Sequence, residues 1–200
     1  MKQLTQYITE KFKLSSKNIK KQYNYHPVDK DELKELINRL IKERGNDANL
    51  NDIDTSNIRN MSELFNGSEF NGDISQWNVS HVIDMRFMFY KSKFNNDISK
   101  WNVSNVKEMR FMFSSSKFNR DISQWNVSNV ENMRFMFDGS EFNGNISKWD
   151  VSKVDDMYHM FIDSKFNGDI SQWNVSNVKD MENMFHNCPL EKNPPKWYKK

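Results

Sequence analysis

Apolar and polar positions repeat along most of this chain with a period of 24 residues. Within one period, Val, Met, Phe, Ile and Trp keep fixed places, and most positions between them are Asn, Ser, Asp, Lys or Glu. Six copies run from Ile53 to Lys196, and the tryptophans mark their register: Trp77, Trp101, Trp125, Trp149, Trp173 and Trp197. A fixed period of this length predicts a solenoid, in which each copy buries its apolar side chains against its neighbours.

Each copy contains two short apolar patterns, and the first predicts a helix of about two turns. Val106, Met109 and Phe113 are spaced like one face of a helix, with Met112 at the edge of that face. Ser104 stands just before this segment and is expected to cap its start.

The second pattern predicts a short strand with a bend. Ile122, Trp125 and Val127 have the spacing of such a strand, and strands from successive copies would lie about 4.8 Å apart as parallel neighbours. We therefore expect an α/β repeat fold, a solenoid of six 24-residue coils with short parallel strands and short helical arcs.

The two ends differ from the repeats and divide the chain into four parts. Residues 1–28 form a basic N-terminal segment, and residues 29–52 form a helical cap and linker. The solenoid follows at 53–196 and overlaps a C-terminal cap at 185–200. The amphipathic pattern and capping residues of the N-terminal cap predict a helix over 29–44: Asp29, Leu33, Leu36, Ile37, Leu40, Ile41 and Gly45.

The unit W-x-V-S-x-V-x-x-M-x-x-M-F-x-x-S-x-F-N-x-D-I-S resembles the BspA-like leucine-rich repeats of bacterial surface proteins, including many mycoplasma lipoproteins. The resemblance extends over all six copies. It implies a leucine-rich-repeat-like solenoid with a β-strand on one face and irregular or helical arcs on the other. It also implies a role in binding or adhesion.

Several residue types form ladders at the 24-residue step. The tryptophans are expected to face the core rather than form a sugar-binding platform, because large aromatic side chains dominate buried area. One ladder of carboxylates is expected to accept turn N–H groups, since calcium requires six or more oxygens: Asp73, Asp97, Asp121 and Asp169, with Asn145 interrupting. A ladder of asparagines is expected to satisfy backbone groups: Asn71, Asn95, Asn119, Asn143 and Asn167.

Arginine and phenylalanine recur side by side in three consecutive copies and then change. These residues are the candidate partner-binding site: Arg86, Phe87, Arg110, Phe111, Arg134, Phe135, Tyr158 and His159. If exposed, they would form a patch of Arg and aromatic residues, the composition favoured at interfaces. The alternative is that the phenylalanines fill a second layer of the core.

The charges nearly cancel, since 29 Lys and Arg stand against 27 Asp and Glu, which gives +2. No global field for nucleic acid follows from this balance. The chain has no apolar run of membrane-spanning length and no secretory signal, so stable membrane insertion is not expected. We expect a cytoplasmic or virion-associated protein, although the family is typically found at the cell surface.

Catalysis finds little support in the sequence. The four histidines have no Ser, Cys or Asp partner at a motif spacing, and Cys188 stands where other copies have serine. No phosphate loop, dinucleotide fingerprint or zinc motif is present. We expect a non-enzymatic binding module without cofactor or metal, whose partner is another protein or a surface glycan.

The first ten residues support an alternative function. MKQLTQYITE resembles the N-terminal targeting peptides of internal head proteins in large tailed phages, which are cleaved after a glutamate in an I-x-E context. Ile8 and Glu10 fit this context. The alternative is therefore a packaged or structural virion protein with a cleavable address. Otherwise Leu4, Ile8 and Phe12 line a short basic helix that docks on the cap, or the terminus is frayed. Binding of this short helix to a membrane surface is a third option, although such binding would be weak.

Overall fold

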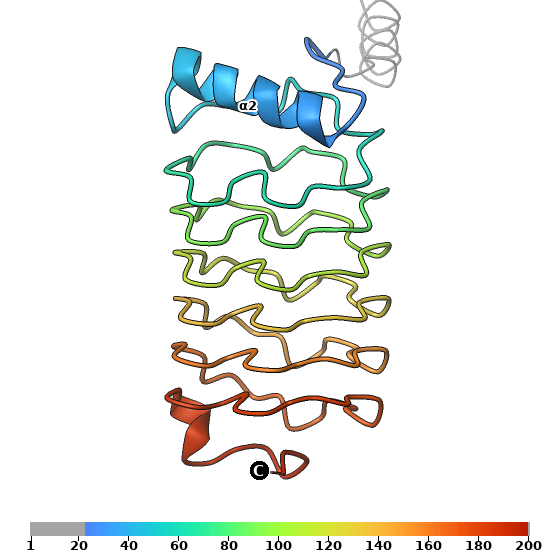
Figure 1. The fold of residues 1–200 in the computed structure, drawn as a ribbon, viewed down its shortest axis with the longest axis vertical. Helices are drawn as coiled ribbons and strands as arrows, with labels where there is room; N and C mark the ends of the chain where they lie inside the picture. The colour runs from blue at the N-terminus through green and yellow to red at the C-terminus, as the bar shows by residue number, and fades with distance from the viewer. Residues whose placement is uncertain (1–22, 200) are drawn as a thin grey trace, which may run out of the picture.

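A computed structural model of the 200-residue chain describes residues 23–199. The chain winds into coils that lie one above another along the long axis, with α2 at one end and the C-terminus at the other (Figure 1). Residues 24 positions apart lie in contact. The rings of Trp77 and Trp101, for example, are 6.4 Å apart between centroids and parallel to within 1°.

Helix α2 (Lys30–Arg44) covers the first coil and matches the helix expected over residues 29–44. The Asp29 carboxylate accepts the N–H groups of Asp31 and Glu32, both at 3.0 Å, and thereby caps the helix start. Its leucines and Ile37 are buried against the coil below. Gly45 follows the helix with a φ of 88°, a conformation that favours glycine.

The expected fold class, an α/β repeat with short parallel strands and helical arcs, is wrong. Within residues 23–199, the remaining helix is the 3-10 helix η1 (Pro189–Glu191), and no strand forms. Neighbouring coils pair instead through isolated parallel bridges: Tyr25 with Ile53, Asn49 with Asp73, and the series Asn60, Asp84, Glu108, Asn132, Asp156 and Asp180.

The arcs that were expected to be helical are series of tight turns. The N–H groups of Met88 and Tyr90 donate to the carbonyls three residues before them, those of Met85 and Phe87, at 3.2 and 3.1 Å. The N–H of Phe87 instead donates to the carbonyl of Arg110 in the next coil, at 3.1 Å. An α-helix requires every N–H to reach back four residues within its own segment. The expected face of Val106, Met109, Met112 and Phe113 is nonetheless buried.

The expected strand over Ile122–Val127 is also a turn. The Trp125 N–H donates to the Ile122 carbonyl at 3.1 Å, which closes a turn where a strand would stay extended. Ser104, the expected cap of the helical segment, caps no helix. Its N–H donates to the side-chain oxygen of Asn102 at 3.2 Å and so closes a turn. Spacing alone does not separate these turns from helices and strands, because all three place the same side chains inward.

Aromatic columns fill the interior of the stack. The indoles of Trp77, Trp101, Trp125, Trp149 and Trp173 are only 3–4% exposed, as expected for core residues. Each indole N–H donates to an isoleucine or leucine carbonyl of the preceding coil, as that of Trp125 does to Ile98 at 3.2 Å. The phenylalanines form fully buried columns beside them, with Phe89 and Phe113 at 5.5 Å between ring centroids.

Polar ladders tie the coils together at their corners, as the sequence predicts. The amide oxygen of each asparagine in one ladder accepts the backbone N–H of the next, as Asn71 does from Asn95 at 2.8 Å. The carboxylate ladder closes turns: Asp97 accepts the N–H of Ser99 at 2.8 Å, and this bond holds the pKa of Asp97 below its usual value. Across residues 23–199, no group of three or more His, Cys, Asp and Glu side chains could hold a metal ion.

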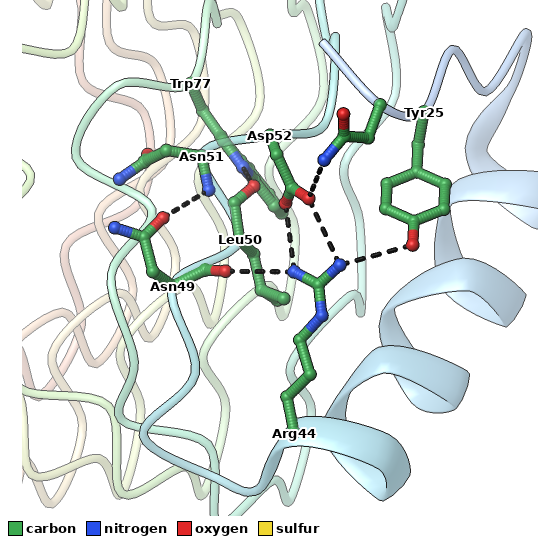
Figure 2. Close-up of polar contacts among 8 residues, drawn as sticks. Tyr25, Arg44, Asn49, Leu50, Asn51, Asp52 and Trp77 are labelled. Carbon is green, nitrogen blue, oxygen red and sulfur yellow. Dashed lines mark hydrogen bonds and ion pairs between the residues drawn. The ribbon is translucent and has the colours of Figure 1, made fainter.

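An arginine fastens α2 to the first coil (Figure 2). The guanidinium of Arg44 donates to both carboxylate oxygens of Asp52 at 3.1 Å, to the Asn49 carbonyl at 3.3 Å and to the Tyr25 hydroxyl at 3.2 Å. Partial burial opposes ionisation of Asp52, yet the bonds from Arg44 and Asn24 keep its pKa lowered. Helix α2 therefore covers the N-terminal end of the stack, and the hydrogen bonds of Arg44 attach it to the first coil.

Candidate functional site

One aromatic column lies on the outside of the stack. We call Phe87, Phe111, Phe135 and His159 the outer column. The phenylalanine rings stack with centroids 4.6 and 4.5 Å apart, and the ring of His159 meets Phe135 edge-on at 5.0 Å. All four side chains are partly exposed, whereas the phenylalanines of the interior columns are fully buried. The structure thus brings the predicted aromatic residues into one continuous surface.

The backbone of the outer column explains why these rings point outward. Every coil has a positive φ at this position, and the members are Glu63, Phe87, Phe111, Phe135, His159 and Asn183, with φ between 49° and 63°. Bulky residues are rare in this left-handed region, which Gly and Asn tolerate best. Three consecutive phenylalanines here are therefore conformationally unfavourable, and ring stacking offsets part of that free energy.

The three predicted arginines flank the outer column but are not equivalent. Arg86 is held by Asp84, whose carboxylate oxygens accept its Nε–H at 2.9 Å. Arg134 lies 4.0 Å above the ring of Tyr158, and its nearest contacts with acids are 3.5 Å to Asp156 and 3.6 Å to Asp180. Most of the positive charge beside the column is therefore balanced within the chain.

The middle arginine is the one whose polar atoms are not all satisfied. Arg110 Nε and Glu108 Oε2 are buried and have no hydrogen-bond partner within residues 23–199. Burial raises the pKa of Glu108, although the nearby guanidinium groups of Arg110 and Arg86 oppose the shift. The centre of the candidate surface thus covers two buried polar atoms that lack a hydrogen-bond partner among the described residues.

The lower end of the surface carries a neutral histidine. The imidazole of His159 stacks on Tyr158, with ring centroids 3.7 Å apart. Burial lowers the pKa of His159, against the opposing field of the Asp138 carboxylate. The imidazole is consequently uncharged near neutral pH, and its buried Nε2 has no hydrogen-bond partner within residues 23–199.

Sequence reasoning missed an aromatic side chain that widens the surface. Tyr90 meets Phe87 edge-on at 5.6 Å, and the Lys91 ammonium lies 4.9 Å from the Tyr90 ring centroid. The sequence could have indicated Tyr90, because no other coil has a tyrosine, phenylalanine or tryptophan at this position. The equivalent residues are Asn66, Ser114, Asp138, Ile162 and His186. A single large aromatic at such a position distinguishes the coil that carries it.

The arrangement offers no catalytic constellation in the part of the chain that the structure describes. No histidine there hydrogen-bonds to a serine or cysteine side chain, and His26 and His186 contact the carboxylates of Asp54 and Glu191. Cys188 is buried, and burial raises the pKa of its thiol, which makes it a poor nucleophile. The outer column and its flanking residues can provide contact area for a binding partner.

Two further expectations concern the N-terminus and the membrane. The proposed cleavage site at Ile8 and Glu10, and the short helix with Leu4 and Phe12, lie outside the described residues. Of the helices in residues 23–199, none combines the length and the apolar character that crossing a bilayer requires.

Comparison with known proteins gave one match. The model of a family described as "Mycoplasma protein of unknown function, DUF285" matches residues 33–141 and 114–198, two overlapping segments that cover the helical cap and the coils. A search of curated proteins and a search of solved structures gave no match to this chain.

Proposed function

The chain belongs to the DUF285 family, and we propose that it is a non-enzymatic binding module whose outer column and flanking arginines contact another protein. The observation that carries the proposal is the partly exposed stack of Phe87, Phe111 and Phe135, with centroids 4.5–4.6 Å apart. Aromatic residues and arginine dominate the binding energy of protein interfaces.

The residue choice at the outer column supports a role beyond folding. Asn183 occupies the same left-handed position in the last coil, where asparagine suits the backbone. Phenylalanine at Phe87, Phe111 and Phe135 is less favourable for the backbone and leaves ring surface exposed to water. Burial of these rings by a partner would remove that unfavourable exposure.

The pairing of charges favours a protein over a nucleic acid. Lysines and acids of adjacent coils form ion pairs along the stack, such as Lys107 with Glu131 at 2.8 Å. The arginines beside the outer column are also close to acids. A nucleic-acid surface needs cations that are free to neutralise phosphates, and this face offers few of them.

The repeat unit also supports a narrower version of the proposal. Its resemblance to BspA-like leucine-rich repeats favours recognition of the adhesion type, in which a surface glycan is the second class of partner. Sugars stack on exposed aromatic faces, and the tryptophan columns are buried. A glycan would therefore have to use the outer column as well, so one set of variants tests both partners.

The test compares two variants that affect the backbone in the same way. Phe111→Asn removes the central ring and places asparagine at a left-handed position, as in the last coil. Ser115→Asn is the matched control, because Ser115 is exposed, has a φ of 55° and corresponds to Asn187 in the last coil.

Wild-type and variant chains are immobilised, incubated with a Mycoplasma cell extract and with a glycan array, and the bound fraction is quantified. We expect Phe111→Asn to capture at least tenfold less of the protein partner than the wild-type chain does. Ser115→Asn should capture as much as the wild-type chain. Equal capture by both variants, at unchanged thermal midpoints, would contradict the proposal.

A further inference from the structure

The last coil differs from the others in what lies against it. In the coil before it, the N–H groups at alternate positions of the arc donate to carbonyls of the next coil: Met157 to Asp180, His159 to Glu182, Phe161 to Met184 and Asp163 to His186, at 2.8–3.1 Å. The same pattern joins each earlier pair of coils from Met61 onward. In the last coil, these donors belong to Met181, Asn183, Phe185 and Asn187.

Three of these four donors have no acceptor within residues 23–199. The Asn187 N–H donates to the Glu191 carboxylate at 2.9 Å. This carboxylate takes the place of the next-coil carbonyl that accepts the equivalent bond in earlier coils. The N–H groups of Met181, Asn183 and Phe185 make no such bond. They form a row of parallel donors, two residues apart, at the C-terminal face of the stack.

Apolar side chains beside these donors are also uncovered. Val175, Val178 and Met181 are partly exposed, whereas their equivalents one coil earlier, Val151, Val154 and Met157, are at most 1% exposed. The C-terminal tail covers only the other side of this face. Trp197 stacks on Trp173 at 6.4 Å, and Tyr198 meets Phe185 edge-on at 4.9 Å.

A groove runs between the uncovered arc and the tail. It has a volume of about 530 Å³, and its walls include Met181, Asn183 and Phe185 on the arc and Pro194 and Tyr198 on the tail. Met181 and Asn183, whose N–H groups are unbonded, therefore line a space of the size that ligand sites commonly have, while Phe185 is 1% exposed against Tyr198.

We propose that this groove binds a peptide segment of the repeat pattern from another polypeptide chain, which adds a partial coil to the stack. The segment supplies main-chain carbonyls two residues apart to the N–H groups of Met181 and Asn183, and its Val and Met side chains cover Val178 and Met181. This recognition resembles the addition of a strand to an exposed sheet edge, where backbone bonds provide affinity and side chains provide selectivity.

The stack itself identifies the occupant. Each preceding arc is covered by an arc with the V-x-x-M-x-x-M pattern, whose carbonyls meet the same donors. A second intact copy fits poorly. The N-terminal face of such a copy is covered by α2. If the copy docked with its C-terminal face instead, the N–H donors of the two last coils would face each other with no acceptor between them. The proposal is independent of the outer column, because it uses backbone groups at the end of the stack.

The test uses the full chain and a synthetic peptide. The peptide NVKEMRFM copies residues 105–112, whose carbonyls at Glu108, Arg110 and Met112 accept bonds from the preceding coil. The control peptide, MFRMEKVN, has the same composition in reverse order. Amide signals of the ¹⁵N-labelled chain are followed during titration, and amide hydrogen exchange is measured at saturation.

We expect NVKEMRFM, and not MFRMEKVN, to shift the amide signals of Met181 and Asn183 and to slow their exchange at least fivefold. Met181→Lys should weaken binding at least fivefold. Ile83→Lys should leave it unchanged, because lysine occupies the equivalent position at Lys107 and Lys179.

Three results would overturn the proposal. The first is the absence of shifts at these two amides. The second is equal shifts with the reversed peptide. The third is a concentration-dependent shift of the same amides without peptide, which would identify a second copy as the occupant.

Discussion

The interior and outer aromatic columns are built from the same repeat step and differ in what surrounds them. Phe113 lies fully buried between Phe89 and Phe137 at 5.5 and 5.8 Å, in a core that water does not reach. Phe111, two residues away in sequence, stacks more closely on its own column yet remains partly exposed. The comparison indicates that ring stacking alone does not make a core, because burial supplies most of the free energy. The interior columns hold the fold, and the outer column is available to a partner.

The largest expected effect on stability comes from removing one phenylalanine ring from an interior column. Phe113→Ala should lower the free energy of unfolding by about 3–5 kcal/mol, because it removes buried area and leaves a cavity between rigid neighbours. Urea denaturation followed by circular dichroism measures this loss. A loss below about 1 kcal/mol would mean that the interior column collapses freely and is not a packed core.

The second effect tests the hydrogen bond that joins each indole to the coil before it. Trp125→Phe keeps an aromatic ring but removes the donor of the 3.2 Å bond to the Ile98 carbonyl. The Ile98 carbonyl then keeps the backbone N–H of Trp101 at 3.1 Å but loses its second donor, so the free energy of unfolding should fall by about 1 kcal/mol. The same denaturation experiment applies, and an unchanged midpoint would indicate that the indole bond contributes nothing.

The third effect concerns pH, to which the histidine of the outer column should respond. The folded-state pKa of His159 lies below its ordinary value of about 6.5. The unfolded chain therefore binds a proton more readily, and stability falls as the pH drops through about 6.5 towards the lower folded value. His159→Asn should reduce this loss between pH 7.5 and 5.5.

The pH experiment needs a control histidine. His81 is exposed, so His81→Asn should keep the wild-type difference between denaturation midpoints at the two pH values. The same pH dependence in wild type and in His159→Asn would contradict a partly buried, neutral imidazole at the end of the outer column.

The smallest effect on stability is expected at the centre of the outer column. Phe111→Asn loses ring stacking but gains a residue that suits a φ of 57°. These contributions are each about 1 kcal/mol and opposite in sign, so the free energy of unfolding should change by less than about 1 kcal/mol. A loss as large as that of Phe113→Ala would place Phe111 in the core.

The 24-residue register allowed the correct prediction of which side chains are buried and which close turns. Trp125 faces inward, and Asn71 and Asp97 satisfy backbone groups as expected. Helix α2 was also predictable, since Asp29 caps it and Gly45 follows it. These features depend on spacing and on local chemistry, both of which are read directly from residue order.

The conformation of the arcs could not be predicted in the same way. Met109 and Phe113 are spaced for one helical face, but the turns place them inward equally well. The decisive feature is the left-handed backbone at Phe111, a residue type that gives no signal for positive φ. The sequence left open whether Phe111 is exposed or fills a second layer of the core, and the structure places its side chain partly exposed.

The separation of a buried interior column from a partly exposed outer column is tested by comparing the solvent contact of two neighbouring rings. Chains with 4-fluorophenylalanine at position 111 or 113 are studied by ¹⁹F NMR with a soluble gadolinium chelate, which broadens signals of exposed groups. We expect strong broadening at Phe111 and little at Phe113. Equal broadening at the two positions would contradict the separation of an interior column from an outer one.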